Sequence, residues 1–274
     1  MRLLAMAVRR RSGAVLAVAA VSLALTACAP DTSMPPPTQA PPADHVVVDF
    51  TVNEAQGVRA TGAEFTDRFG TYRQVELAPD APAREFDPQA FDALVLEIYG
   101  ADLAAQGQSF AAEFIAKHYM DNPAVYDNSR ENRFAYRDST EGLIVPAQSQ
   151  VWADDVLDSA AGWATDKQVL AAINTGAGVL PYASGQARYA LRTFDLESAT
   201  LNEADGGIVF TFAVEYDRPM LSAGTDAYLT TSGKYVLVVV ADVSDDWFVS
   251  GWGQDVDSTL YYWDGTATQR ELKR

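Results

Sequence analysis

Residues 208–216 read Ile-Val-Phe-Thr-Phe-Ala-Val-Glu-Tyr, and an apolar side chain stands at every second position of this stretch. A period of two is typical of a β-strand that buries one face. The Gly206-Gly207 pair just before it is a hairpin signal, and Pro219 is expected to end the strand. The alternating residues are Ile208, Phe210, Phe212, Val214 and Tyr216.

Three further segments around this one also indicate strands. Residues 187–200 alternate loosely, and residues 247–252 follow an acidic Asp245-Asp246 turn. Residues 234–243 are apolar on both parities, as in a strand covered on both faces. The second half of the chain therefore predicts an antiparallel meander of about four strands.

Helices are expected before this meander. A helix starting after Ser109 has an apolar stripe of Phe110, Ala111, Phe114, Ile115 and His118, and Asn122-Pro123 ends it. An earlier helix from Asp87-Pro88 to about Tyr99 is stopped by Gly100. Its expected buried positions are Phe91, Leu94, Val95 and Ile98. Residues 152–163 and 167–174 are two further helical patches.

The order of elements predicts an α+β fold, with N-terminal helices packed on a curved antiparallel sheet of about four strands. Residues 45–52 and 71–77 are expected to pair as strands in an additional N-terminal β/α extension. The predicted domains are a signal peptide at 1–27, a lipidated cysteine and Pro-rich linker at 28–44, the extension at 45–108 and a cone-like α+β domain at 109–274.

The predicted helix at 110–121, the two hairpins and the Asp-Asp-Trp-Phe-Val sequence at 245–249 resemble the nuclear transport factor 2-like superfamily. The resemblance covers residues 109 to about 254 and implies a cone-shaped fold with an interior pocket. Ketosteroid isomerases of this superfamily use a carboxylate base and acidic donors deep in the cone. No such motif is matched residue by residue here, so no catalytic residue is assigned. A generic α+β lipoprotein sandwich is the rival fold.

The N-terminus has the order of a secretory signal. Residues 1–13 carry four arginines and no acid, and residues 14–27 are almost entirely apolar. This apolar run is shorter than the ~20 residues that a membrane-spanning helix needs. Its end, Leu25-Thr26-Ala27-Cys28, resembles the bacterial lipobox. The resemblance implies that Cys28, the only cysteine of the chain, is acylated and holds the protein in membrane lipid at the outer face of the cytoplasmic membrane.

Composition separates an expected spacer from the folded part and excludes one class of partner. Residues 29–44 contain six of the 13 prolines and favour an extended, semi-rigid linker. The signal holds four of the 20 basic residues and none of the 37 acidic ones, so the mature chain has a net charge of −21. Such a charge repels polyanions, and nucleic acid is not expected as a partner.

Motifs for metal or cofactor chemistry are lacking. The histidines are His45 and His118, and residues 255–266 lack the glycine and glutamate of a calcium loop at Leu260 and Thr266. We expect no metal, no cofactor and no assigned catalytic residue. His118 is the candidate cavity residue, with a hydrogen-bonded packing role as the alternative. Glu113 and Asp121 are expected on solvated helix faces.

Aromatic residues are the remaining signal. Three interpretations are open for these residues: they line a pocket, they form a surface for a partner, or they pack in the core. Core packing explains most of them. The consecutive run at Tyr261, Tyr262 and Trp263 cannot point inward as a whole. The other members are Tyr126, Phe134, Tyr136, Trp152 and Trp163.

The first hypothesis is an exported, lipid-anchored protein that binds a small apolar ligand or an envelope protein. Under this hypothesis the protein is not an enzyme. The alternatives are an isomerase, dehydratase or hydrolase working in the cone, and a solute-binding lipoprotein associated with a transporter. A buried, paired carboxylate, or His118 in a sizeable pocket, favours the enzyme. A filled cone with an exposed aromatic patch favours the binding protein.

Overall fold

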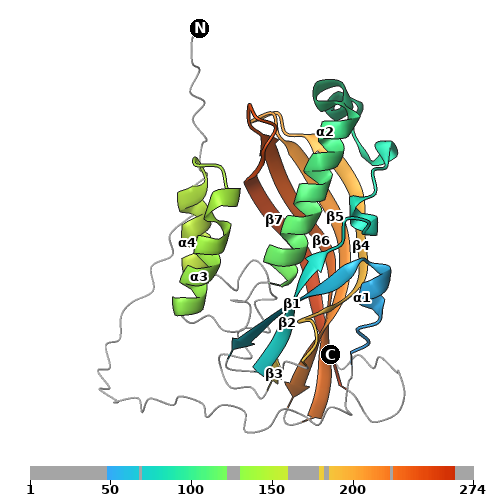
Figure 1. The fold of residues 1–274 in the computed structure, drawn as a ribbon, viewed down its shortest axis with the longest axis vertical. Coiled ribbons are helices and arrows are strands. Elements are labelled where there is room, and N and C mark those ends of the chain that lie inside the picture. Colours follow the sequence, from blue (N-terminus) through green and yellow to red (C-terminus); the bar gives the residue numbers. More distant parts are fainter. Residues whose placement is uncertain are drawn as a thin grey trace, which may run out of the picture. The chain divides into compact units, whose positions relative to one another are not determined.

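The structure, a computed structural model, describes residues 48–67, 70–121, 130–159, 179–181, 185–222 and 225–262 (Figure 1). These residues belong to one compact unit, residues 36–274. Its helical elements are α1 (Val52–Ala55), η1 (Pro82–Arg84), η2 (Pro88–Ala90), α2 (Ala93–Phe114), the π-helical segment η3 (Ile115–Met120), α3 (Arg130–Thr140), η5 (Glu141–Leu143) and α4 (Ser149–Ser159). Its strands are β1 (Val58–Asp67), β2 (Gly70–Leu77), β3 (Val179–Pro181), β4 (Ala190–Leu201), β5 (Ile208–Ser222), β6 (Thr225–Ala241) and β7 (Trp247–Tyr262).

The main sheet is antiparallel and has the strand order β3-β5-β6-β7, with β4 also paired to β5. The α+β class and the C-terminal meander are therefore confirmed. The strands are longer than predicted, and Pro219 does not end β5. Pairing with β4 reaches Asp217 and pairing with β3 begins at Met220. Pro219 thus lies at the junction of the two partners, where its missing N–H costs the sheet little.

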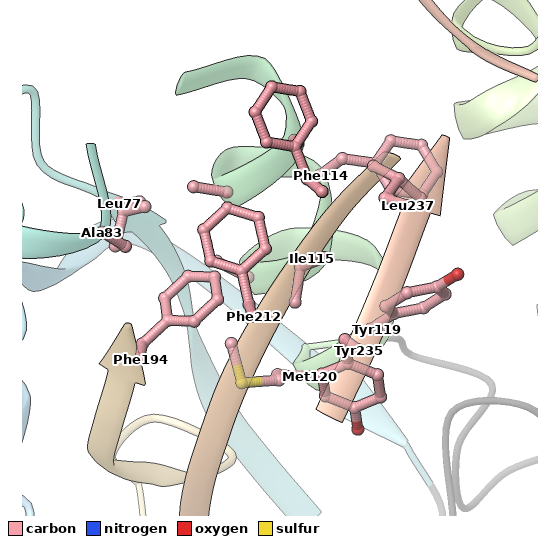
Figure 2. Packing of buried hydrophobic residues seen from close by; sticks show 14 of the residues in the cluster. Leu77, Ala83, Phe114, Ile115, Tyr119, Met120, Phe194, Phe212, Tyr235 and Leu237 are labelled. Carbon is pink, nitrogen blue, oxygen red and sulfur yellow. The ribbon is translucent and has the colours of Figure 1, made fainter. Parts of the chain in front are cut away.

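The alternating residues of β5 face the core, as predicted. Phe210, Phe212 and Tyr216 are fully buried, and α2 packs against β4, β5 and β6. Figure 2 shows Phe212 with Phe194 and with Ile115 of η3 in one apolar cluster. In the predicted helix stripe, Ala111, Phe114 and Ile115 are buried, whereas Phe110 and His118 are only half-buried.

Strand β6 is buried on only one of its two faces along the apolar stretch at 235–240. Tyr235, Leu237 and Val239 are fully buried, whereas Val236, Val238 and Val240 on the other parity are half-buried. The prediction of a strand covered on both faces is therefore wrong there. The chain around Val48 covers the outer face near Tyr228, and this cover does not extend to Val236–Val240.

The predicted strand at 45–52 is wrong in its described part, because residues 48–51 form a bend and a turn that lead into α1. Side chains cover the edge of β4 in its place. Asn53 donates to the Tyr189 carbonyl at 3.1 Å and accepts from the Leu191 N–H at 2.6 Å. Gln56 donates to the Arg192 carbonyl at 2.9 Å. The predicted strand at 71–77 is confirmed as β2, and it pairs with β1.

Helix α2 joins the two predicted helices across a break at Gly100, whose φ of 73° and ψ of 164° are not helical. Asp87 caps η2, and Asp92 caps α2 itself. Phe91 and Val95 are buried as predicted, but Leu94 and Ile98 are 44% and 56% exposed. Phe91 is extended and lies before α2, so the spacing of three and four counted from it does not define one face of this helix.

The α3–η5–α4 segment contacts the sheet at β7. The Val145 N–H donates to the Val249 carbonyl at 2.9 Å, and the Trp152 ring meets the Trp252 ring edge-on at 4.8 Å. Helix α3 was not expected, and α4 corresponds to the first part of the predicted patch at 152–163. The rest of that patch and residues 167–174 lie outside the described residues. Among the described helices, none combines the length and hydropathy needed to cross a bilayer.

Candidate functional site

A pocket of about 310 Å³ lies along one face of α2 and η3. Its helical wall uses positions spaced three and four apart, so they share one face of the helix. Leu143 of η5 forms the opposite apolar wall. The full lining is Phe110, Glu113, Phe114, Lys117, His118 and Leu143.

One wall of this pocket is charged. The Glu113 carboxylate accepts from Arg84 Nη2 at 2.7 Å and, through its other oxygen, from Lys117 Nζ. Arg84 is held by the Leu77 carbonyl at 3.0 Å and by the Ser109 hydroxyl. Burial opposes ionisation, but the hydrogen bonds from Lys117 and Arg84 prevail, and they lower the pKa of Glu113. Two ion pairs therefore hold the Glu113 carboxylate in place, whereas its sequence position indicated a free, solvated side chain.

His118 lies in this pocket, between aromatic rings. Its ring centroid is 4.8 Å from that of Phe114 and 6.1 Å from that of Tyr136, whose hydroxyl donates to the His118 carbonyl at 2.8 Å. Burial, and then the charge of Lys117, lower its pKa to about 4. The imidazole is therefore neutral at pH 7 and adds no charge to the pocket wall.

The π-helical segment η3 supplies two side chains to the pocket and ends next to a second group of polar side chains. π-Helical turns are rare in proteins overall, and those that do occur are frequently found at functional sites. In η3, Ile115 and Met120 are fully buried, while Lys117 and His118 line the pocket. Asp121 follows immediately as the C-cap residue. One short segment therefore separates an open pocket from a second, enclosed polar cluster.

Asp121 is the centre of that enclosed cluster, and the expectation of a solvated Asp121 is wrong. Asp121 is only 7% exposed, because the end of η3 packs against β2 and because the Arg188 side chain lies beside the carboxylate. One carboxylate oxygen accepts from the Val75 N–H at 3.2 Å, and the other lies 3.7 Å from Arg188 Nε. Burial raises its pKa to about 7, against the opposing charges of Arg188 and Arg218.

The charges of Arg188 and Arg218 act on this carboxylate, and its own charge acts on Tyr189. The Arg188 guanidinium lies over the Tyr72 ring at 3.8 Å, and Arg218 donates to the Met120 carbonyl at 3.1 Å. The Tyr216 and Tyr235 hydroxyls share a hydrogen bond of 2.6 Å. Burial raises the pKa of Tyr189 and of Tyr235, so both stay protonated. A carboxyl group whose pKa lies near neutrality can both hold and release a proton at pH 7, which proton transfer requires.

The remaining predicted site residues fall into three groups. Cys28 lies outside the described residues, as do Tyr126, Trp163 and Trp263. Tyr136 and Trp152 are core residues, and Tyr261 stacks on Tyr228 with 5.1 Å between ring centroids. Residues 255–262, the first part of the stretch compared with a calcium loop, lie in β7, and residues 263–266 lie outside the described residues.

Lys117 and Asp121 are the functional candidates that sequence reasoning missed. Lys117 could have been found, because it stands one turn after Glu113 on the helix face shared with Phe110 and Phe114. Asp121 carried no local signal, since its burial depends on β2 and on Arg188, far away in sequence. No family model, curated protein or solved structure matches the chain.

Proposed function

We propose that this is an exported, lipid-anchored protein that binds a small, largely apolar ligand without transforming it, in the pocket between α2 and η5. The observation that carries the proposal is the pocket itself, in which Phe110, Phe114 and Leu143 present apolar surface around a space of about 310 Å³. Concave, mostly apolar spaces of ~300–1,000 Å³ are typical of small-molecule sites.

The packing of the interior supports a binding role on this outer helix face. Beneath the pocket, α2 and η3 close onto the sheet through fully buried side chains, among them Ala111, Ile115 and Phe212. The pocket side of the same helix keeps Phe110 half-buried, so apolar surface remains there for a ligand to cover.

The proposed location rests on residues 1–28 alone. A basic segment, an apolar run of 14 residues and a cysteine at the cut site favour export and diacylation. Two acyl chains give stable membrane attachment, whereas one chain gives only marginal attachment. The Pro-rich stretch at 29–44 is then a spacer between lipid and the folded unit.

Calorimetric titration of the mature protein with 1-octanol, a neutral probe, tests the proposal. Burying its chain contributes at most about 6 kcal/mol, at ~0.8 kcal/mol per CH₂. Immobilisation costs part of this, so we expect one-site binding with a dissociation constant of about 1 mM, which corresponds to ~4 kcal/mol. Leu143→Arg places a charge in the apolar wall and is expected to abolish binding. Ile98→Arg, at a 56% exposed position, is the matched control.

A titration without saturable heat, or equal binding by wild type and Leu143→Arg, contradicts the proposal. Circular dichroism shows whether each variant retains its fold. If Ile98→Arg loses binding to the same extent as Leu143→Arg, the octanol is bound elsewhere.

A second candidate function is proton transfer at a carbon next to a carbonyl, and the buried pair of Asp121 with Arg188 favours it. The superfamily resemblance adds that carboxylates perform such chemistry in ketosteroid isomerases. The test is deuterium exchange at the α-carbon of a β,γ-unsaturated cyclic ketone. Exchange that is lost in Asp121→Asn supports this candidate, and an exchange rate equal to that of buffer excludes it for this ketone.

A further inference from the structure

We propose that the pocket selects an amphiphile with a single negatively charged headgroup, such as a medium-chain carboxylate, and that Lys117 pairs with that headgroup. This inference rests on the proposed function, since it assigns a ligand class to the same pocket. It follows from the balance of charge in the pocket wall, from the donors that remain on Lys117 and from the size of the space.

The charged wall contains two cations for one anion. Arg84 and Lys117 both bind the Glu113 carboxylate, one at each oxygen. The neutral imidazole of His118 leaves this balance unchanged. Counted over the described side chains of this wall, one positive charge is therefore in excess, in a chain whose formal net charge is −17. An anionic group at this point restores neutrality.

The two cations are not equivalent. Arg84 is only 15% exposed at its side chain, and the Leu77 carbonyl and the Ser109 hydroxyl also hold it. The Lys117 side chain is 37% exposed and lines the pocket. An ammonium group carries three N–H donors, of which Glu113 takes one. Lys117 is therefore the residue placed to donate to a ligand headgroup.

The position of the apolar residues sets how the ligand lies. Phe110 and Phe114 stand on the same helix face as Lys117, and Leu143 faces them from η5. A chain that packs between these side chains brings its polar end to the Glu113–Lys117 wall. At ~30 Å³ for each water-sized group, about 310 Å³ holds about ten non-hydrogen atoms. Octanoate has this size.

The overall charge of the protein sharpens the inference. At long range an acidic chain repels anions, so binding of an anion requires a short-range contact that outweighs this repulsion. The acidic chain attracts cations at long range, but the excess positive charge in the pocket wall repels a cationic headgroup at short range. Selection for an anion is thus a property of the pocket and runs opposite to the charge of the surface.

The experiment titrates the mature protein with octanoate, 1-octanol and octylammonium at pH 7.5 by calorimetry. We expect octanoate to bind about tenfold more tightly than 1-octanol, and octylammonium to bind most weakly. In Lys117→Gln the octanoate-to-octanol ratio is expected to fall from about tenfold to about one. Lys234→Gln removes an exposed pair with Glu197 on the sheet and is the matched control, with the ratio unchanged.

The outcomes separate this inference from the proposed function. If none of the three compounds binds, the proposed function itself fails. If all three bind equally, or Lys117→Gln keeps the tenfold ratio, the charge selection is wrong while the apolar pocket stands. If Lys234→Gln lowers the ratio as much as Lys117→Gln does, the effect belongs to overall charge and the assignment of Lys117 is overturned.

Discussion

Truncating Phe212 tests the packing of α2 on the sheet. Phe212 is fully buried in the middle of β5, and its ring centroid lies 5.0 Å from that of Phe194 and 6.3 Å from that of Phe210. A buried aromatic removes ~150–250 Å² from water, and at ~25 cal/mol per Å² this contributes about 4–6 kcal/mol. Alanine retains a small part of this and leaves a cavity. We therefore expect Phe212→Ala to lower the free energy of unfolding by about 3–5 kcal/mol.

Thermal unfolding followed by circular dichroism measures this loss. For a unit of this size, 1 kcal/mol corresponds to ~2–4 °C, so Phe212→Ala is expected to melt about 6–20 °C below wild type. Ile98→Ala, at the exposed position in α2, is the control and is expected to change the stability by less than about 0.5 kcal/mol. A Phe212→Ala protein that melts within about 2 °C of wild type refutes the packing described for β5.

Three further predictions concern the anchor, the buried carboxyl group and the approach of α2 to the sheet. Cys28→Ser is expected to accumulate as precursor or to be released into the medium, as shown by fractionation and lipid labelling. Asp121 has a folded-state pKa of about 7, above its usual 3.8, so the stability from its protonated form is lost as pH rises through 7. Asp121→Asn avoids that loss, so its stability relative to wild type is expected to rise by at least about 1 kcal/mol between pH 5 and pH 8.5 in thermal melts. A Cβ at Gly107 meets the Trp247 ring at 2.8 Å, so Gly107→Ala is expected to cost about 1–3 kcal/mol, whereas Gly142→Ala, with open space around it, costs less than about 0.5 kcal/mol in the same melts.

The local sequence pattern was sufficient to predict the strand β5. It was insufficient to predict which segments pack against the sheet. The period of two at 208–216 predicted β5 and its buried face, because alternation along a strand depends only on the strand itself. Pro219 was misjudged because its effect depends on which neighbour β5 has at that position. The segment at 48–52 has high strand propensity, yet the hydrogen bonds of Asn53 to β4 and the packing around Val48 determine its conformation.

The candidate site divides in the same way. His118 was found because its place in an apolar helix stripe is a local property. The role of Lys117 depends on Arg84, which approaches from η1, and on Leu143, which closes the pocket from η5. The burial of Asp121 depends on Val75 and Arg188, 46 and 67 positions away along the chain. Contacts across such separations are set by the fold and leave no trace in local spacing.

Nuclear magnetic resonance of the two histidines tests the central claim, ligand binding between α2 and η5, most directly. The chain has only His45 and His118, so imidazole labelling gives two signals, and one of them belongs to a residue that lines the pocket. Octanoate is expected to shift the His118 signal saturably at pH 7 and to leave the His45 signal in place. In the absence of ligand, His118 is expected to remain neutral down to about pH 4. An unchanged His118 signal at octanoate concentrations that saturate the calorimetric titration contradicts the assignment of the binding site to this pocket.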